Sequence, residues 1–195
     1  MTKLNFQRLF FFLMIVAFFS GCDSKKNEAA SPPAPKVENV APAPDPSAEA
    51  RVNLNQAFAY ISSAKVAPNK AARDELLNNA EIELSAAIVK KPDYVEALSN
   101  RGVIYITLGK LNKAEEDLKR AVQINPTHAD SLYNLACLYS LTQKLDLAAD
   151  ALSQSLASGF NDTERLRNDP DLKSLRSTKQ FSEILEKNKI FLGKR

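Results

Sequence analysis

The pattern that most constrains this chain is a set of residues that returns every 34 positions. Large and small apolar residues of one segment come back in the next, either identical or conservatively changed. The matching pairs are Leu98 and Leu132, Gly102 and Ala136, Tyr105 and Tyr139, Ala114 and Ala148, and Leu118 and Leu152. A repeat of this length indicates a stack of similar units, none of which buries its apolar face alone.

Two helices are predicted within each unit, because the apolar residues have helical spacing on both sides of a polar turn. Pairs with the spacing of a capping box recur at the same interval and predict where the first helices begin. These pairs are Asp93 with Glu96, Thr127 with Asp130, and Asn161 with Glu164. The four prolines after residue 49 stand at expected helix boundaries, where proline is tolerated.

This pattern resembles the tetratricopeptide repeat (TPR), a family of helical hairpins that stack into a solenoid. The resemblance implies an all-α fold, namely a short solenoid of about three hairpins with a C-terminal helical cap. The expected parts are a divergent first hairpin over 50–92, repeats over 93–126 and 127–160, and capping helices over 161–192. Arg101 stands at a position that is usually apolar in this family.

The predicted cap begins where the repeat pattern ends. Asp169 is suited to cap a new helix and Pro170 to occupy its first turn, so together they interrupt the preceding helix. Ser177 with Gln180 has capping-box spacing and predicts the start of a further short helix. A repeat array needs such a cap to cover its last apolar face.

Residues 1–21 have the composition of a secretory signal peptide. Lys3 and Arg8 precede an apolar run over 9–19, which is too short to span a membrane. The Phe-Ser-Gly sequence before Cys22 resembles the lipobox of bacterial lipoproteins, which implies cleavage and a covalent lipid on Cys22. Asp23 is associated in enterobacterial lipoproteins with retention in the inner membrane, so that membrane is favoured while the outer one stays open. An uncleaved signal anchor is the alternative.

Residues 22–49 are predicted to form the lipidated N-terminus and a disordered Pro/Ala-rich tether. This stretch holds more than half of the chain's ten prolines and no aromatic residue. Val37 and Val40 are its large aliphatic residues. Such a segment cannot bury enough apolar surface to offset the entropy lost on ordering.

The family resemblance also places a partner-binding groove on the concave side, lined by the first helix of each hairpin. The candidate residues are Glu96, Ser99, Asn100, Val103 and Thr107 from one helix, and Asp130, Tyr133, Asn134, Cys137 and Ser140 from the next. Asn100 and Asn134 are suited either to bond the backbone of an extended peptide or to join neighbouring repeats, and both interpretations stay open. Tyr133 is either an aromatic anchor for a partner or an ordinary packing residue.

Some family members grip a C-terminal carboxylate with lysines in this groove. The candidate residues include no lysine, and Glu96 and Asp130 border them. We therefore expect the groove to take a basic or neutral segment instead.

Composition excludes several other functions. One histidine and two cysteines are too few for a His/Cys zinc site, and five glycines leave no phosphate-binding loop. The net charge of +3 falls to +1 once Lys3 and Arg8 are removed, so nucleic acid is not an expected partner. Cys137 is interpreted as a small buried residue. We expect no enzymatic activity and no metal or cofactor besides the covalent lipid.

The sequence therefore predicts a non-enzymatic, lipid-anchored scaffold or adaptor on the periplasmic or extracytoplasmic side of a bacterial membrane. Its groove would bind a peptide or protein partner, such as a subunit of an envelope complex, in envelope, secretion or pilus assembly. One alternative is a structural lipoprotein that self-associates through its repeats. Another is a cytoplasmic TPR adaptor whose N-terminus has been misread. The partner, the oligomeric state, and the choice between groove and cap as binding surface stay open.

Overall fold

The computed structural model of the protein describes residues 46–192, and this range is all-α, as the sequence predicts. The predicted signal peptide, Cys22 and the tether up to residue 45 lie outside the described residues. Helix α1 begins at Pro46, inside the stretch that was predicted as tether up to residue 49. Proline suits the first turn of a helix, because the N–H that it lacks would have no helical partner there.

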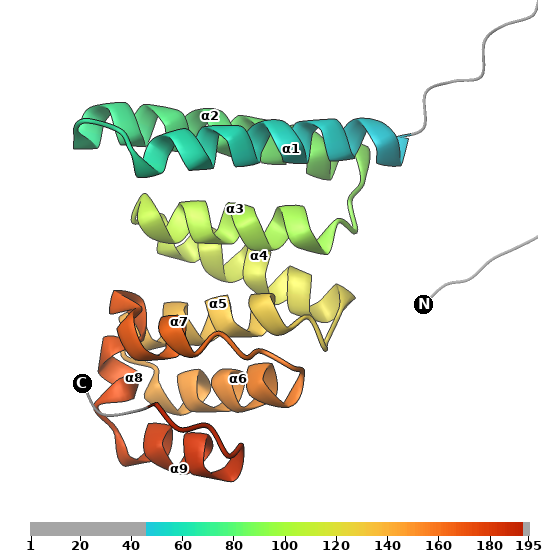
Figure 1. Cartoon of the computed structure of the whole chain (residues 1–195). Coiled ribbons are helices and arrows are strands. Elements are labelled where there is room, and N and C mark those ends of the chain that lie inside the picture. Colours follow the sequence, from blue (N-terminus) through green and yellow to red (C-terminus); the bar gives the residue numbers. More distant parts are fainter. Residues whose placement is uncertain (1–45, 193–195) are drawn as a thin grey trace, which may run out of the picture. The chain divides into compact units, whose positions relative to one another are not determined.

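Three hairpins lie one after another in the described part of the chain (Figure 1). They pair α1 (Pro46–Lys65) with α2 (Lys70–Lys90), α3 (Val95–Thr107) with α4 (Leu111–Ile124), and α5 (Ala129–Leu141) with α6 (Leu145–Ala157). Helices α1 and α2 have 20 and 21 residues, whereas α3 and α4 have 13 and 14. The loop end of the first hairpin therefore projects past the end of α3 (Figure 1).

A C-terminal cap follows the third hairpin. It consists of α7 (Thr163–Asn168), the 3₁₀ turn η1 (Pro170–Leu172), α8 (Lys173–Arg176) and α9 (Lys179–Lys187). Turn η1 and helix α8 pack against α5, and α9 packs against α6. The Asp169 side chain accepts a hydrogen bond from the Asp171 N–H at 3.0 Å and Pro170 takes the first position of η1, as predicted.

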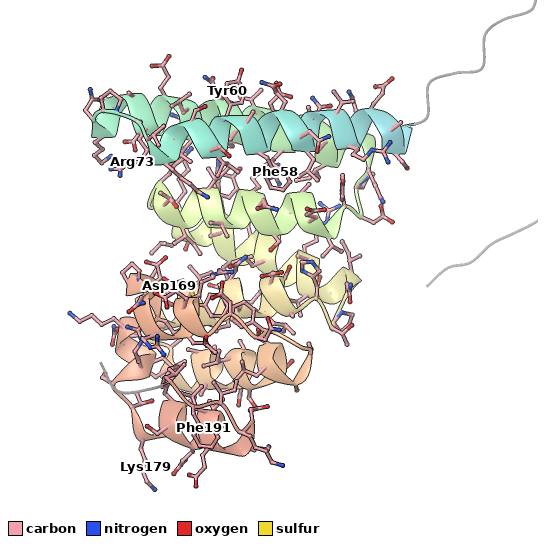
Figure 2. All side chains as sticks on the ribbon, in the orientation of Figure 1. Phe58, Tyr60, Arg73, Asp169, Lys179 and Phe191 are labelled. Carbon is pink, nitrogen blue, oxygen red and sulfur yellow. The ribbon has the colours of Figure 1, made fainter. Side chains whose placement is uncertain are left out.

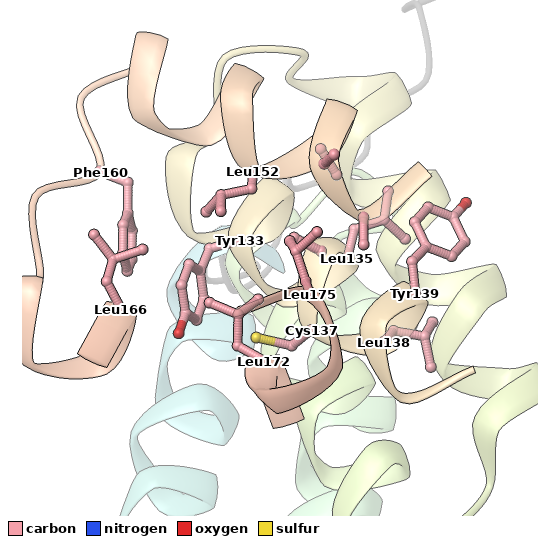
Figure 3. Packing of buried hydrophobic residues seen from close by; sticks show 14 of the residues in the cluster. Tyr133, Leu135, Cys137, Leu138, Tyr139, Leu152, Phe160, Leu166, Leu172 and Leu175 are labelled. Carbon is pink, nitrogen blue, oxygen red and sulfur yellow. The ribbon is translucent and has the colours of Figure 1, made fainter. Parts of the chain in front are cut away.

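Two apolar clusters form the core of the described residues. The first joins α1, α2 and α3 and includes Leu54, Leu84 and Leu98. The second joins α5, α6 and the cap (Figure 3), and Leu152 and Leu172 are fully buried in it. Each fully buried leucine stabilises the fold by about 1.5–3 kcal/mol relative to an exposed one. No helix in residues 46–192 combines the length and apolar character needed to cross a membrane.

Gly102 lies where α3 packs closely against α4. A Cβ atom added there would lie 2.7 Å from Cγ of Leu118, nearer than side chains normally pack. Ala136 occupies the matching position on α5 and is fully buried. The small residues of the repeat thus let two helices approach each other, and the approach at Gly102 leaves no room for a methyl group.

Arg101 is accommodated by a polar contact in place of the apolar one that is usual at its position. Its Nε and Nη2 donate to the Asp117 carboxylate at 2.7 and 2.8 Å, and Nη1 donates to Ser85 Oγ at 3.0 Å. The hydrogen bond to Asp117 raises the pKa of Arg101, so the guanidinium stays charged. A two-pronged contact of this kind holds α2, α3 and α4 in one geometry.

The predicted starts of the first helices are displaced by one residue. The N-caps are Tyr94, His128 and Asp162 rather than Asp93, Thr127 and Asn161. Thr178 likewise caps α9 in place of Ser177. The displacement is the same at all four starts, so the 34-residue interval between the first three is retained.

Candidate functional site

One side of α3 forms the floor of two adjoining cavities. Both are lined by Asn100 and Val103, so they form one continuous groove. The apolar pocket has a volume of about 350 Å³ and is lined by Ile61, Ala64, Lys65, Arg73, Leu77, Asn100, Val103, Ile104 and Thr107. The polar pocket has a volume of about 370 Å³ and is lined by Phe58, Glu96, Ser99, Asn100, Val103, His128, Asp130, Asn134 and Arg165.

The apolar pocket exists because the first hairpin is longer than the second. The projecting ends of α1 and α2 supply one wall, which includes the buried side chains of Ala64 and Leu77. Val103 on α3, with 37% of its surface exposed, lies on the opposite side. Lys65 and Arg73 are exposed, and Figure 2 shows Arg73 at the loop end of the hairpin. Neither of these two cations forms an ion pair within residues 46–192.

Asn100 is the central polar residue of the groove. Its Nδ2 donates a hydrogen bond to the backbone oxygen of Glu96 at 2.8 Å, and this contact orients the amide. Its side-chain oxygen accepts no hydrogen bond from another described residue. Glu96 is exposed and also has no ion-pair partner in the described part. The groove therefore presents a free acceptor and a free negative charge one helical turn apart.

Arg165 of α7 closes the far end of the polar pocket. Its Nη1 lies 3.4 Å from Oδ1 of Asp130, and its Nη2 donates to Oδ1 of Asn134 at 3.0 Å. Its guanidinium carbon lies 4.2 Å from the centre of the Tyr133 ring, where a cation is attracted by the ring electrons. The negative charge of Asp130 is thus partly neutralised, whereas that of Glu96 is not.

The cap covers the side of α5 that corresponds to the open side of α3. Tyr133 is fully buried and stacks on Phe160, with ring centres 4.2 Å apart and planes 13° from parallel (Figure 3). Its hydroxyl donates to Oδ2 of Asp169 at 3.1 Å. Burial raises the pKa of the Tyr133 hydroxyl, so it stays protonated and keeps this donor. These contacts show that the Tyr133 side chain packs between α5 and the cap and is not available as an anchor for a partner.

Cys137 and Ser140 are enclosed in the same way. The Cys137 thiol is 3% exposed and lies 3.7 Å from Oδ2 of Asp169. Burial, together with the negative charge of Asp169, raises the pKa of this thiol well above its usual value, so Cys137 is a poor nucleophile. Ser140 is fully buried, and its hydroxyl oxygen accepts a hydrogen bond from the backbone N–H of Leu175 at 3.2 Å. The prediction of an open groove at Tyr133, Cys137 and Ser140 is therefore wrong, because the cap covers this part of α5, whereas Asp130 at the start of the helix stays at the polar pocket.

The two asparagines of the repeat have different environments. Asn134 is 8% exposed and donates from Nδ2 to Ser99 Oγ at 3.2 Å, so it joins neighbouring repeats. Ser99 itself is 3% exposed and offers little surface to a partner. Asn100 keeps the free acceptor that a partner needs. The sequence candidates that line the groove with accessible surface are Glu96, Asn100, Val103, Thr107 and Asp130. Ser99 and Asn134 also line the polar pocket but are buried.

The sequence interpretation missed the contribution of the first hairpin and of α7 to the groove. Phe58 on α1 lies on the side that faces α3 (Figure 2), and Lys65 and Arg73 border the apolar pocket. The expectation that the groove lacks lysine is therefore wrong on this side. The helical spacing of Phe58 and Ile61 signals an apolar face. The 34-residue interval does not align the longer first hairpin with the second one. The role of Phe58 and Ile61 in the groove therefore could not be inferred from matching positions in the next repeat.

The residues that line the groove offer an amide oxygen, a carboxylate and apolar surface to a binding partner. Within residues 46–192, no three histidine, cysteine or acidic side chains are grouped so as to hold a metal ion. The fold and the groove together define a class of protein, a solenoid of helical hairpins with an open channel for a partner.

The comparison with known families gives this class its name. Tetratricopeptide repeat profiles match residues 95–128 and 118–150. The chain therefore carries tetratricopeptide repeats over residues 95–150, and proteins with this repeat typically serve as scaffolds for protein interaction. None of the curated protein sequences matches the chain significantly.

Several solved structures have the same fold. The first TPR domain of Spaghetti (RPAP3) bound to the HSP90 peptide SRMEEVD is 20% identical, with a TM-score of 0.53, and the match covers 72% of this chain and 95% of that one. A thermophilic TPR protein from Thermus thermophilus is 27% identical, with a TM-score of 0.54 and 62% of each chain covered. MamA is 22% identical, with a TM-score of 0.53, covering 74% of this chain and 81% of that one.

Proposed function

We propose that the protein is a non-enzymatic, lipid-anchored scaffold or adaptor on the periplasmic side of a bacterial membrane. The groove along α3 binds an extended segment of a protein partner, such as a subunit of an envelope, secretion or pilus assembly. The observation that carries the proposal is the continuous groove in which Asn100 keeps a free amide oxygen. The structural likeness to a TPR domain bound to an HSP90 peptide supports this use of the groove.

The side chains of the groove suit an extended backbone. The amide oxygen of Asn100 accepts an N–H of the partner, and Val103 beside it contacts an apolar side chain. Glu96 and Asp130 border the polar pocket and favour basic or neutral side chains at that end.

A crosslinked affinity purification from native membranes tests the groove. The variant Glu96→Lys with Asn100→Ala changes exposed or half-buried groove residues, so the fold should be retained, as circular dichroism would verify. The matched control is Glu116→Lys with Asn112→Ala on exposed positions of α4. We expect an envelope protein to be recovered with the wild type and the control but lost with the groove variant. Recovery of the same partners with all three proteins would contradict the groove as the binding surface.

The anchor is proposed from the N-terminal sequence, which lies outside the described residues. Cys22 carries the lipid, residues 23–45 form a tether, and Asp23 favours the inner membrane. Cys22→Ala should release the protein from membranes and abolish metabolic labelling with a fatty-acid analogue. A membrane-bound and unlabelled Cys22→Ala protein would point to an uncleaved signal anchor instead.

A further inference from the structure

We propose that the apolar pocket selects partner segments in which an acidic side chain is directly next to an apolar one. The inference rests on the groove function proposed above and names the chemistry of the partner. The apolar side chain enters the pocket between the first hairpin and α3, and the carboxylate beside it pairs with Lys65 and Arg73. The acid is a side chain within the segment, and the end of the partner chain is not needed.

The lining of the apolar pocket accounts for the preference for an apolar side chain. Ile61, Ala64, Leu77, Val103 and Ile104 contribute apolar surface from three different helices. A volume of about 350 Å³ lies at the lower end of the range for ligand pockets, roughly 300–1,000 Å³. The space therefore suits one large apolar side chain with its neighbouring backbone.

The basic residues at the edge of the apolar pocket account for the preference for an acidic side chain. Lys65 and Arg73 are the charged residues that line the apolar pocket, and no acidic residue lines it. Neither has an ion-pair partner within the described residues, so both are free for a carboxylate. Guanidinium groups bind a carboxylate through two parallel N–H donors, which gives Arg73 a geometric preference for an acid.

The groove as a whole then has two ends of opposite charge. Lys65 and Arg73 lie at the end near Thr107, whereas Glu96 lies near the other end of α3. Thr107 follows Glu96 by eleven positions in the helix, which corresponds to roughly 16 Å. An extended segment spans this length with about five residues. The expected partner therefore carries its acidic–apolar pair about five residues from a basic or neutral position. On this proposal, the expected basic or neutral side chains are confined to the Glu96 end of the groove.

Fluorescence anisotropy with labelled peptides tests this preference on the full-length protein in detergent. The probes are N-acetylated, C-terminally amidated dodecapeptides that carry aspartate next to leucine, with a lysine five residues away in either chain direction. Their comparators replace the aspartate by lysine or the leucine by serine. Because both ends are blocked, a side chain provides the only carboxylate at the test position. We expect the aspartate–leucine probe in one direction to bind about tenfold more tightly than either comparator.

A charge reversal of the pocket provides the second arm. Lys65→Glu with Arg73→Glu should reverse the preference, so that the lysine comparator binds better than the aspartate probe. The matched control is Arg51→Glu with Lys173→Glu, which makes the same change in net charge at exposed positions outside both pockets. The control should leave the wild-type preference unchanged. The peptide exchange on the wild type decides the question even if a variant fails to fold.

The possible failures separate the inference from the groove function. Peptides that bind with less than a twofold change on aspartate-to-lysine exchange would overturn the acidic–apolar preference and leave the groove function standing. If the control variant changed the peptide preference as much as the pocket variant, the cause would be net charge in general. This result would also overturn the acidic–apolar preference and leave the groove function standing. Absence of binding by every peptide would overturn the inference, and the membrane purification with the Glu96 and Asn100 variant would then decide on the groove by itself.

Discussion

Helices α3 and α5 hold matching positions of the same repeat, yet the groove side is open along α3 and mostly covered on α5. Val103 is 37% exposed and Cys137, 34 residues later, is 3% exposed. Asn100 is half-buried with a free oxygen, whereas Asn134 is buried and bonded on both sides of its amide. The difference lies in the neighbours, since the long first hairpin leaves a pocket beside α3 and the compact cap fills the one beside α5. A repeat pattern thus specifies which side of a helix faces the groove, and the flanking elements decide whether that side is open.

The largest expected contrast compares truncations at the two surfaces. Tyr133→Ala removes a fully buried ring that stacks on Phe160, so it should lower the free energy of unfolding by about 3–5 kcal/mol. Val103→Ala removes part of an exposed side chain and should cost less than about 1 kcal/mol. Urea denaturation followed by circular dichroism measures both. Equal losses for the two variants would show that Tyr133 is not enclosed by the cap.

The two asparagines give the next contrast. Asn134→Ala removes the hydrogen bonds to Ser99 and from Arg165 and should cost about 1–2 kcal/mol. Asn100→Ala removes a contact to its own helix at the open groove and should change stability by less than about 0.5 kcal/mol. The same denaturation experiment compares them. A larger loss for Asn100→Ala than for Asn134→Ala would reverse the assigned roles.

Gly102→Ala probes how closely the second hairpin is packed. The added methyl group meets Leu118 at 2.7 Å, and such overpacking costs about 1–3 kcal/mol. The better helix propensity of alanine offsets up to about 1 kcal/mol of this cost, so we expect the free energy of unfolding to fall by about 1 kcal/mol. Thermal unfolding should show a lower midpoint than the wild type. A higher midpoint would mean that Leu118 moves aside without cost.

The smallest expected change in stability depends on pH and arises from Asp171 in the cap. Burial and the neighbouring Asp169 raise the pKa of Asp171, so the folded cap holds this proton more tightly than the unfolded chain. The stabilisation by the protonated form is complete below the unfolded pKa and is lost as the pH rises through the folded pKa. Asp171→Asn should therefore raise stability at pH 7 by about 0.5 kcal/mol, after allowance for solvent screening.

The advantage of Asp171→Asn should vanish at pH values below about 4, where both proteins are uncharged at this site. Thermal melts of the two proteins at pH 7 and at pH 3 measure the difference. An advantage of equal size at both pH values would mean that the charge of Asp171 is not its cause.

The repeat pattern predicted the hairpins from sequence because it reports contacts within a unit. Gly102 lies against Leu118, and the Tyr105 ring lies beside Lys113, so each touches its own hairpin and its type recurs wherever the hairpin recurs. Helix starts were predicted one residue early. At α5 the reason is that the His128 ring caps the helix in place of the neighbouring Thr127 hydroxyl. Local sequence contains both possible caps and does not choose between them.

The groove could be predicted only in part, because its boundaries depend on contacts between units. No pattern in α5 indicates that Asp169 and Leu175, from the cap, cover Cys137 and Ser140. Likewise, the contribution of Lys65 and Arg73 depends on how far the first hairpin projects past α3. These are properties of chain segments that meet only in the folded structure.

The most direct test of the contrast between α3 and α5 compares thiol reactivity at the two matching positions. In a Cys22→Ala background, the native Cys137 is the single thiol, and Val103→Cys adds a second one at the open groove. We expect the introduced thiol to react with a maleimide or disulfide reagent at the rate of an exposed cysteine. Cys137 should react at least about 100-fold more slowly, since its reaction requires the cap to open and its raised pKa disfavours the thiolate. Equal rates for the two thiols in the native state would contradict a closed surface on α5.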